Sequence, residues 1–357
     1  MASITLRNLV KKFGPRITAV AGVNLEVADG EFMVLVGPSG CGKTTTLNMI
    51  SGFEVPTEGT LMIGDRVVND LDPGERSLGM VFQDLALFPH MTVFENIAFG
   101  LRVDQLPDAE VEERVNRVAQ TMKIVPLLKK KPAQCSGGEV QRIALARTIV
   151  TEPEVLLMDE PLSSLDAKLR IEMRTELKRL HEKLKSTFLY VTHDQAEAMT
   201  MADRIMVMDW GHVQQIGTPL EIYRKPVNQF VATFFGQPTM NIIAGAATNT
   251  GDPRFTSDHF EVPLSDAAIP PSVAGKRVNL GVRSENVIIG DDGAEGEVRL
   301  IEPLGDETLV FFSCGEEDFL VGKVDADREF SPGDKIRFGF EPGRLHFFDI
   351  DNGSRLE

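Results

Sequence analysis

The sequence predicts an α/β domain built around a mainly parallel sheet, followed by a smaller all-β domain. Short apolar runs alternate with amphipathic stretches over roughly the first two thirds of the 357 residues. After about residue 237, short strand-like segments alternate with turns rich in Gly and Pro. Charge changes at the same place: residues 238–357 carry 11 Lys and Arg against 23 Asp and Glu, whereas residues 1–237 carry 26 against 30. We therefore expect one domain over 1–237 and a second over 238–357.

Three buried strands are predicted in the first domain, with a helix at 47–51 after a Gly-rich turn and another between the second and third strands. The runs 32–36, 155–158 and 188–191 are apolar or aromatic throughout and have the length of buried strands. A helix lies between the last two runs, because apolar side chains recur at spacings of three and four at Leu169, Met173, Leu177, Leu180 and Leu184. Strands that alternate with helices in this way form a mainly parallel sheet.

The polar, Glu-rich segment 104–120 predicts a further helix. It places Val111, Val115 and Val118 at helical spacing. Most of its other residues are typical of a solvated helix face. We expect a helical subdomain beside the sheet, over about 88–150.

The second domain reads as a small barrel or sandwich. The segment 308–312 has the composition of a strand, and 331–334, Ser-Pro-Gly-Asp, has that of a turn. The region is strongly acidic, and the whole chain carries a net charge of −16. Nucleic-acid binding depends on Lys and Arg contacts with phosphates, so this charge argues against a nucleic-acid partner.

Other classes of protein are disfavoured by what the sequence lacks. No stretch approaches the ~18 consecutive apolar residues of a membrane-spanning helix, and the first residues lack the basic-then-apolar arrangement of a signal peptide. Cys41, Cys135 and Cys314 lie far apart, so they form neither a disulfide framework nor a CxxC metal pair. These features favour a reducing cytoplasm.

A phosphate-binding loop follows the first predicted strand. Residues 37–44 read Gly-Pro-Ser-Gly-Cys-Gly-Lys-Thr and fit G-x-x-x-x-G-K-[ST] at every fixed position. Glycines let consecutive N–H groups turn toward phosphate oxygens, and the helix that follows directs its positive end to the same place. Lys43 is expected to reach the β- and γ-phosphates, and the Thr44 hydroxyl to ligate Mg²⁺. An accidental Gly-rich turn is the alternative, which the order strand, loop and helix disfavours.

Two further strand ends carry polar side chains. Asp159 ends the run 155–158 and is placed to hold Mg²⁺, directly or through water. Glu160 follows it and could polarise an attacking water. His193 ends the next strand at the same edge, where open α/β sheets bind ligands. Adjacent acids and a lone His at strand ends are common without function, so these assignments depend on the phosphate-binding loop upstream.

The segment 135–139, Cys-Ser-Gly-Gly-Glu, resembles the L-S-G-G-Q signature of ATP-binding cassette (ABC) ATPases. The other motifs of that family occur in its order along residues 3–237: Phe13, the phosphate-binding loop, Gln83, the signature, Asp159-Glu160, Asp166 and His193. Seven ordered motifs are far more specific than a lone phosphate-binding loop. The resemblance implies a P-loop ABC ATPase domain with a helical subdomain that hydrolyses ATP.

The resemblance also implies a role for each motif. Two copies face each other head to tail in this family, so a homodimer with two composite ATP sites is expected. Glu160 would be the general base, His193 would contact the γ-phosphate, and Phe13 would stack on adenine. Mg²⁺ would be held by Thr44, Gln83 and Asp159. Nucleotide contacts would also come from the loop, from the signature and from the segment that couples the two sites: Gly37, Pro38, Ser39, Gly40, Cys41, Gly42, Lys43, Thr44, Thr45, Ser136, Gly137, Gly138 and Asp166.

Two positions depart from the family pattern. Cys135 stands where Leu is usual, and Glu139 stands where Gln is usual. The phosphate-facing positions 136–138 remain, and a helix N-terminus there suits an anion. Glu139 adds negative charge close by, so altered kinetics are expected rather than loss of function.

The lack of membrane spans implies that the pore is on other chains, as in importers of this family. The segment 83–96 resembles the importer form of the Gln-containing loop, and its apolar residues could accept a helix of a membrane subunit. Some of these residues would instead belong to the domain's own core. The implied partners are two transmembrane permease subunits and, indirectly, an extracytoplasmic solute-binding protein. The chain would lie peripherally at the cytoplasmic face of the inner membrane.

Two segments of the second domain resemble sugar-importer ATPases of the maltose type. Residues 281–285 match G-[IV]-R-P-E except at Ser284, and 304–308 match L-G-x-E-T. They imply an OB-like (TOBE/MOP-type) domain for regulation and dimer contact, and a carbohydrate-type solute. Importers of glycerol phosphate, polyamines or ferric ion share this plan. A soluble ABC ATPase of DNA repair or translation fits less well, because the chain has one phosphate-binding loop and no dividing heptad run.

Overall fold

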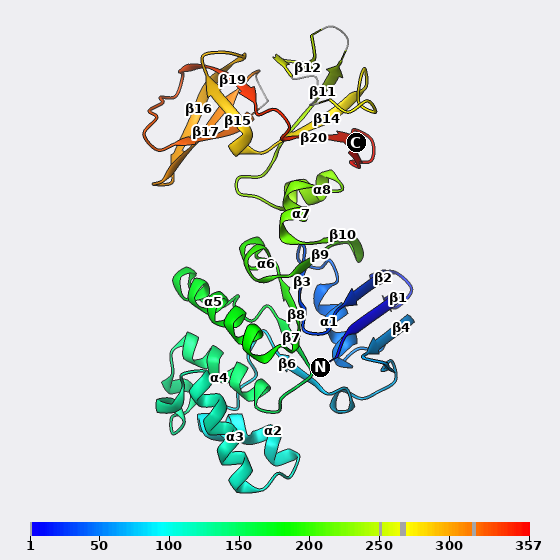
Figure 1. The fold of residues 1–357 in the computed structure, drawn as a ribbon, viewed down its shortest axis with the longest axis vertical. Coiled ribbons are helices and arrows are strands. Elements are labelled where there is room, and N and C mark those ends of the chain that lie inside the picture. The colour runs from blue at the N-terminus through cyan, green and yellow to red at the C-terminus, as the bar shows by residue number, and fades with distance from the viewer. Residues whose placement is uncertain (1, 250–251, 265–268, 316–318) are drawn as a thin grey trace. The chain divides into compact units, whose positions relative to one another are not determined.

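The computed structural model describes residues 2–249, 252–264, 269–315 and 319–357. The chain divides into two compact units, 1–220 and 221–357 (Figure 1). Within the described residues, no helix combines the length and the apolar character that crossing a bilayer requires. Each unit has its own core and is described by itself.

A six-stranded sheet forms the centre of the first unit, in the order β10-β9-β3-β8-β7-β6. Strands β9, β3, β8, β7 and β6 run parallel, and β10 pairs antiparallel with β9. The predicted strands and the mainly parallel sheet are confirmed. The strands are β3 Phe32–Val36, β6 Leu78–Val81, β7 Val155–Asp159, β8 Thr187–Thr192, β9 Arg204–Asp209 and β10 His212–Gly217.

A second, antiparallel sheet in the order β2-β1-β4-β5 shares one hydrophobic core with the first. Fully buried Ile4 and Leu61 of this sheet belong to the same cluster as Leu35 of β3 and Leu47 of α1. Helix α1 therefore lies in the core between the two sheets, and its start is held firmly. The elements are β1 Ile4–Phe13, β2 Ile17–Val27, α1 Lys43–Ser51, β4 Glu58–Ile63 and β5 Arg66–Val67.

Helices α2, α3 and α4 fall within residues 88–150 and are drawn at the lower end of Figure 1. Val111, Val115 and Val118 are buried on α3, as their spacing predicts. The helix begins at Asp108, because Pro107 restricts the residue before it to extended conformations. Besides α1, the α-helices described in the first unit are α2 Val93–Val103, α3 Asp108–Thr121, α4 Gly137–Ile149, α5 Ala167–Leu184 and α6 Gln195–Met201.

Within its described residues, the second unit contains two short α-helices and two antiparallel sheets, which confirms the all-β expectation for the C-terminal region. Both sheets contribute to one core, in which Phe255, Phe312, Phe338 and Phe347 are buried. The sheet orders are β13-β12-β11-β14-β20-β21 and β15-β19-β16-β17-β18. The elements are α7 Pro219–Arg224, α8 Gln229–Phe234, β11 Asn241–Thr248, β12 Arg254–Ser257, β13 Glu261–Pro263, β14 Arg277–Val282, β15 Val287–Gly290, β16 Ala294–Pro303, β17 Glu307–Ser313, β18 Phe319–Asp325, β19 Lys335–Phe340, β20 Leu345–Asp349 and β21 Arg355–Leu356.

The compact units divide the chain after Leu220, whereas the sequence pattern changes at about 237. Arg283 supplies the physical reason. Its guanidinium, 3% exposed, donates to the carbonyls of Tyr223 at 3.0 Å, Ala232 at 3.3 Å and Phe235. These bonds attach α7 and α8 to the β-rich unit.

His346 makes the stability of the second unit depend on pH. Burial, together with the nearby cations Arg355 and Arg283, lowers its pKa to about 4. In the unfolded chain the pKa is about 6.5, so the unfolded state binds more protons between these values. Stability present above pH 6.5 is therefore lost as the pH falls toward 4, by about 3 kcal/mol. Amide hydrogen exchange in β14 and β20, corrected for intrinsic rates, should show this loss, and His346→Gln should remove most of it. An unchanged pH dependence in the variant would contradict this assignment.

Candidate active site

The phosphate-binding loop lies between β3 and α1, as the sequence predicts. Two of its glycines are required by close backbone approaches. A Cβ at Gly37 would lie 2.2 Å from the carbonyl oxygen of Met208, and one at Gly42 would lie 2.4 Å from that of Ala19. Gly42 also has a φ of +105°, which other residues rarely adopt. The loop is thus held tightly between β2 and β9.

Lys43 is the first residue of α1, and its side chain turns back into the loop. Its Nζ donates to the carbonyl oxygens of Gly37 at 2.8 Å and Pro38 at 2.9 Å, and the residue is 5% exposed. A cation is therefore fixed where the backbone of the loop curves. Cys41 is buried beside it, and burial raises the pKa of the Cys41 thiol.

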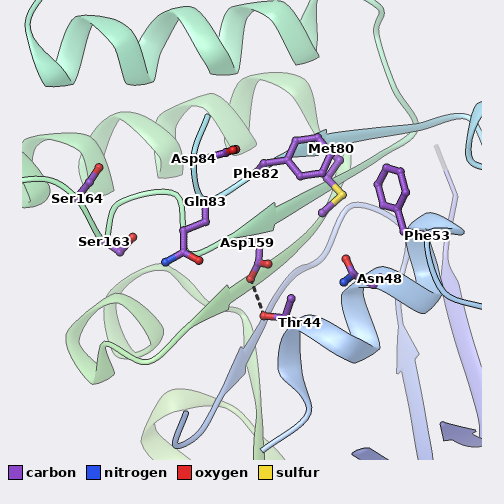
Figure 2. A pocket seen from close by; sticks show the side chains of 10 residues that line it. All are labelled: Thr44, Asn48, Phe53, Met80, Phe82, Gln83, Asp84, Asp159, Ser163 and Ser164. Carbon is purple, nitrogen blue, oxygen red and sulfur yellow. Dashed lines mark hydrogen bonds between the residues drawn. The ribbon is translucent and has the colours of Figure 1, made fainter. Parts of the chain in front are cut away.

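Thr44 and Asp159 meet at the edge of the sheet. The Thr44 hydroxyl donates to Asp159 Oδ1 at 3.1 Å, although the two residues belong to α1 and β7. Asp159 is 8% exposed, and burial raises the pKa of its carboxyl. Together with Gln83, these residues line a cavity of about 900 Å³ (Figure 2).

The donor set on this cavity fits Mg²⁺. A hydroxyl, a carboxylate and an amide oxygen are the hard ligands that Mg²⁺ binds, and a desolvated carboxylate gains from a nearby cation. The described residues contain no cluster of three or more His, Cys, Asp or Glu that could hold a metal alone. Mg²⁺ typically binds one or two carboxylates together with substrate phosphates, so this site suits a metal that arrives with a nucleotide.

The cavity also has a side that the sequence did not predict. Figure 2 shows Phe53, Met80 and Phe82 on the opposite wall from Ser163 and Ser164. The Phe53 and Phe82 rings pack with their centroids 5.8 Å apart. In the sequence, the only indication that Phe82 lines the cavity is its position directly before Gln83. The remaining lining residues are Asn48 and Asp84.

Glu160 and His193 form a direct pair. The His193 Nδ1 lies 3.0 Å from Glu160 Oε2, and their side chains are 57% and 19% exposed, respectively. The Glu160 backbone has a φ of 43° and donates its N–H to the carbonyl of Val191 at 2.9 Å. A positive φ at a residue other than Gly is strained and is typical of functional sites. The two residues proposed for water activation and γ-phosphate contact therefore lie side by side.

A polar network behind His193 was not predicted from the sequence. Arg170 of α5 bonds to Asp194 at 3.2 Å and to the carbonyl oxygen of Leu165 at 3.0 Å, so it joins the segments that carry His193 and Asp166. The buried Glu197 carboxylate accepts hydrogen bonds from the hydroxyls of Tyr190 at 2.8 Å and Thr192 at 2.6 Å. Burial raises the pKa of Glu197. These contacts fix the loop between β8 and α6.

The signature segment forms the start of helix α4. The Ser136 side chain accepts the N–H of Glu139 at 3.4 Å, and the Glu139 carboxylate accepts the N–H of Ser136 at 2.7 Å. This capping box lowers the pKa of Glu139. A Cβ at Gly138 would lie 2.8 Å from the Leu169 side chain. Ser136 and Gly137 are exposed. Among the described residues, neither of them forms a hydrogen bond with the phosphate-binding loop of the same chain.

Two other predicted site residues also lie outside this cluster. Phe13 ends β1 and is 42% exposed, with the Lys11 ammonium 5.0 Å from its ring centroid. Asp166 begins α5, where its carboxylate accepts the N–H of Leu169 at 3.0 Å. The side chains of Phe13 and Asp166 are therefore exposed to solvent, and among the described residues neither forms a hydrogen bond with Lys43 or Asp159.

Comparison with known proteins identifies the family. Residues 20–163 match the ABC transporter family, and residues 280–348 match the TOBE domain. The chain is 46% identical over 369 residues to the sn-glycerol-3-phosphate import ATP-binding protein UgpC of Cupriavidus pinatubonensis (strain JMP 134 / LMG 1197), with 100% of both chains covered. This chain belongs to the ABC transporter family.

Other relatives agree with this assignment. UgpC of Yersinia pseudotuberculosis serotype I (strain IP32953) is 43% identical over 360 residues, with 100% of both chains covered. A dimeric ATP-binding cassette in a post-hydrolysis state, bound to ADP and phosphate, has a TM-score of 0.55 and 34% identity, covering 60% of this chain and 98% of that one. The cassette cbiO1 of Clostridium perfringens, part of an ABC transporter complex, has a TM-score of 0.58 and 28% identity, covering 61% and 89%. The chain is thus an ATP-binding import subunit with ATPase activity, as its motifs predict.

Glu139→Gln is expected to preserve or raise the ATPase activity of this ABC protein. The Gln amide oxygen can still accept the Ser136 N–H, so the start of α4 is retained, while a negative charge beside the signature is removed. Steady-state ATPase rates of the two proteins test this expectation. Glu95→Gln is the matched control, because Glu95 makes the same capping box at the start of α2. A sharp fall in activity for Glu139→Gln alone would show that the carboxylate itself is needed.

Proposed function

We propose that two copies of this chain clamp ATP and Mg²⁺ between them, and that hydrolysis drives uptake of a carbohydrate-type solute through separate membrane subunits. Glycerol 3-phosphate is the first candidate solute, because the relatives that match along the whole chain import it. The observation that carries the proposal is the convergence of Lys43, the Thr44–Asp159 pair and the Glu160–His193 pair at one end of the parallel sheet.

Each of these groups has a distinct part in the hydrolysis. The Lys43 ammonium exchanges its bonds with loop carbonyls for bonds with the β- and γ-phosphates. Thr44, Gln83 and Asp159 hold Mg²⁺, which when bound offsets the charge on the phosphate oxygens. Glu160 orients a water and accepts its proton as the oxygen attacks the γ-phosphorus and the bond to ADP breaks. His193 holds the Glu160 carboxylate in place and contacts the γ-phosphate.

The exposed motifs complete the site across a homodimer. Ser136, Gly137 and Gly138 stand at the N-terminus of α4, where a helix attracts phosphate, and they make no bond to their own loop among the described contacts. We propose that they serve the nucleotide of the second copy, and that Asp166 couples the two sites. The exposed Phe13 ring supplies a surface for adenine.

Two transmembrane permease subunits and an extracytoplasmic solute-binding protein complete the proposed transporter. The chain would act peripherally at the cytoplasmic face of the inner membrane. The segment 83–96 begins at the cavity of Figure 2 with Gln83, and Leu85 and Ala86 have positive φ values of 59° and 45°. Arg147 of α4 donates to both of their carbonyls. A helix of a membrane subunit that touched this segment would therefore act on the helix that begins with the signature.

Co-expression with membrane subunits tests the proposal. The chain should appear in the membrane fraction only when permease subunits encoded beside it are present, and vesicles should then take up labelled glycerol 3-phosphate with ATP hydrolysis. Maltose and a polyamine serve as competing solutes under the same conditions. ATP hydrolysis without membrane association or uptake would contradict the importer, whereas preferred uptake of another solute would correct the substrate alone.

A further inference from the structure

Glu197 is a buried acid close to the active site, and none of the parts assigned above in the hydrolysis of ATP uses it. It lies in the first turn of α6 and is 2% exposed. Burying an ionisable carboxyl group is costly unless hydrogen bonds replace those it made with water. Because the fold keeps such a group shortly after His193 in the chain, the bonds of its side chain indicate what it does there.

The Glu197 carboxylate begins a chain of hydrogen bonds that ends at the peptide group after His193. The Thr192 hydroxyl donates to Glu197 Oε2 at 2.6 Å and accepts the N–H of Asp194 at 2.9 Å. A hydroxyl has one proton to give, so a carboxylate that takes it leaves the lone pairs of Thr192 for the Asp194 N–H. The Glu197 N–H donates in turn to Asp194 Oδ1 at 3.1 Å, which closes a ring of bonds around this turn.

The ring of His193 depends on its backbone for its position against Glu160. The side chain is 57% exposed, so little packing holds it. Arg170 also anchors this segment through Asp194, but the ion pair spans 3.2 Å between side chains 32% and 22% exposed, and ion pairs open to water contribute little. Thr192 is only 2% exposed, and its bond to a carboxylate is of the stronger, charge-assisted kind. The buried bonds at Thr192 are therefore the firmer anchor.

We propose that Glu197 is a positioning residue of the ATPase site. Through Thr192 it holds the peptide that follows His193, and it thereby keeps the imidazole ring in contact with Glu160. The inference rests on the parts proposed above for Glu160 and His193, and it adds a residue that acts only through others. Glu197 supplies a hydrogen-bond acceptor, since the hydroxyls of Tyr190 and Thr192 both donate to the same oxygen, Oε2.

Tyr190 separates this role from a purely structural one. Its hydroxyl donates to Glu197 Oε2 at 2.8 Å, and the residue is fully buried. Tyr190→Phe therefore removes a buried bond to Glu197 but leaves the bonds that Glu197 forms with Thr192 and Asp194. If Glu197 only attached α6 to β8, loss of the Tyr190 bond and loss of the Thr192 bond would have similar effects.

Steady-state ATP hydrolysis by the full chain, together with the Kd for a fluorescent ATP analogue, tests the proposal. In Thr192→Val, which keeps the shape of the side chain, kcat should fall at least about tenfold, because a small displacement of a reacting group is costly. The Kd should stay close to that of the unchanged protein, since Lys43 and its loop are untouched. Glu197→Leu should have the same two effects.

Two conservative variants should keep most of the activity. Glu197→Gln should retain kcat, because one amide oxygen can accept both hydroxyls that now bond to Oε2. Tyr190→Phe should retain it because the link to His193 is intact. Circular dichroism checks the fold of every variant, and Thr192→Val decides the question if Glu197→Leu does not fold.

A double-mutant comparison shows whether Thr192 acts through His193. His193→Gln should itself lower kcat, and adding Thr192→Val to it should cause little further loss, because two residues that act as one unit are not additive. Unchanged turnover in His193→Gln would remove the part proposed for His193 in hydrolysis, and this inference with it.

The other outcomes concern Glu197 alone, once His193→Gln is impaired. The inference is overturned by unchanged kcat in a folded Thr192→Val protein, or by a loss in Tyr190→Phe as large as that in Thr192→Val. It is also overturned by equal losses in Glu197→Gln and Glu197→Leu, or by a full further loss when Thr192→Val is added to His193→Gln.

Discussion

Glu160→Gln is expected to lower the rate of ATP turnover by about 10²–10⁴-fold, which is the usual contribution of a general base. The amide keeps the size of the side chain and can still bond to His193, but it cannot accept a proton from water. Because Lys43 and Asp159 are untouched, ATP binding should survive, and the dimer should accumulate in the ATP-bound state. Steady-state ATPase assays and size-exclusion chromatography with ATP measure the two effects.

Glu172→Gln is the matched control for this experiment. Glu172 lies exposed on α5, and its side chain makes no hydrogen bond or ion pair among the described residues. The control should hydrolyse ATP at the rate of the unchanged protein. Unchanged turnover in Glu160→Gln would show that another group accepts the proton. A protein that stays monomeric with ATP would show that the two copies do not share the nucleotide.

Lys43→Ala is expected to weaken ATP binding by roughly 100-fold or more, because two or more hydrogen bonds from a charged group to phosphate are lost. Lys43 is 5% exposed and its Nζ is already held at the loop, so little ordering is needed when phosphate arrives. Equilibrium binding of a fluorescent ATP analogue measures this effect. Hydrolysis should fall with it.

Lys129→Ala removes an exposed lysine of the same unit and should leave ATP affinity unchanged. Loss of the fold is a separate outcome for Lys43→Ala, and circular dichroism distinguishes it from loss of binding. The loop conformation itself depends on the close contacts at Gly37 and Gly42, which the substitution leaves in place. A folded Lys43→Ala protein with ordinary ATP affinity would contradict the assignment of the loop to the phosphates.

Local sequence patterns predicted much of the first unit. The apolar runs at 32–36 and 155–158 are the strands β3 and β7, because runs of four or five adjacent apolar residues are typical of strands in a sheet that is covered on both faces. The spacing of Met173, Leu177 and Leu180 likewise predicted the buried face of α5. The order of strands could not be predicted in this way, since β3 pairs with β8 and β9, which lie more than 150 residues further along the chain.

The motif residues of the candidate site were named from the sequence, but the contacts between them were not. The motifs name Glu160 and His193, yet their 3.0 Å contact and the positive φ of Glu160 follow from the packing of β7 against β8. The role of Arg170 could not be predicted from any motif, because it depends on hydrogen bonds to Asp194 and to Leu165, which lie on different segments.

The sequence by itself therefore determined the α/β and all-β composition, the ABC family and the candidate residues of the site, because burial patterns and phosphate-binding motifs are local. Only the tertiary structure decided which polar groups bond to each other and the attachment of α7 and α8 to the second unit. Such contacts join segments far apart in the chain, so they form only when the cores have packed.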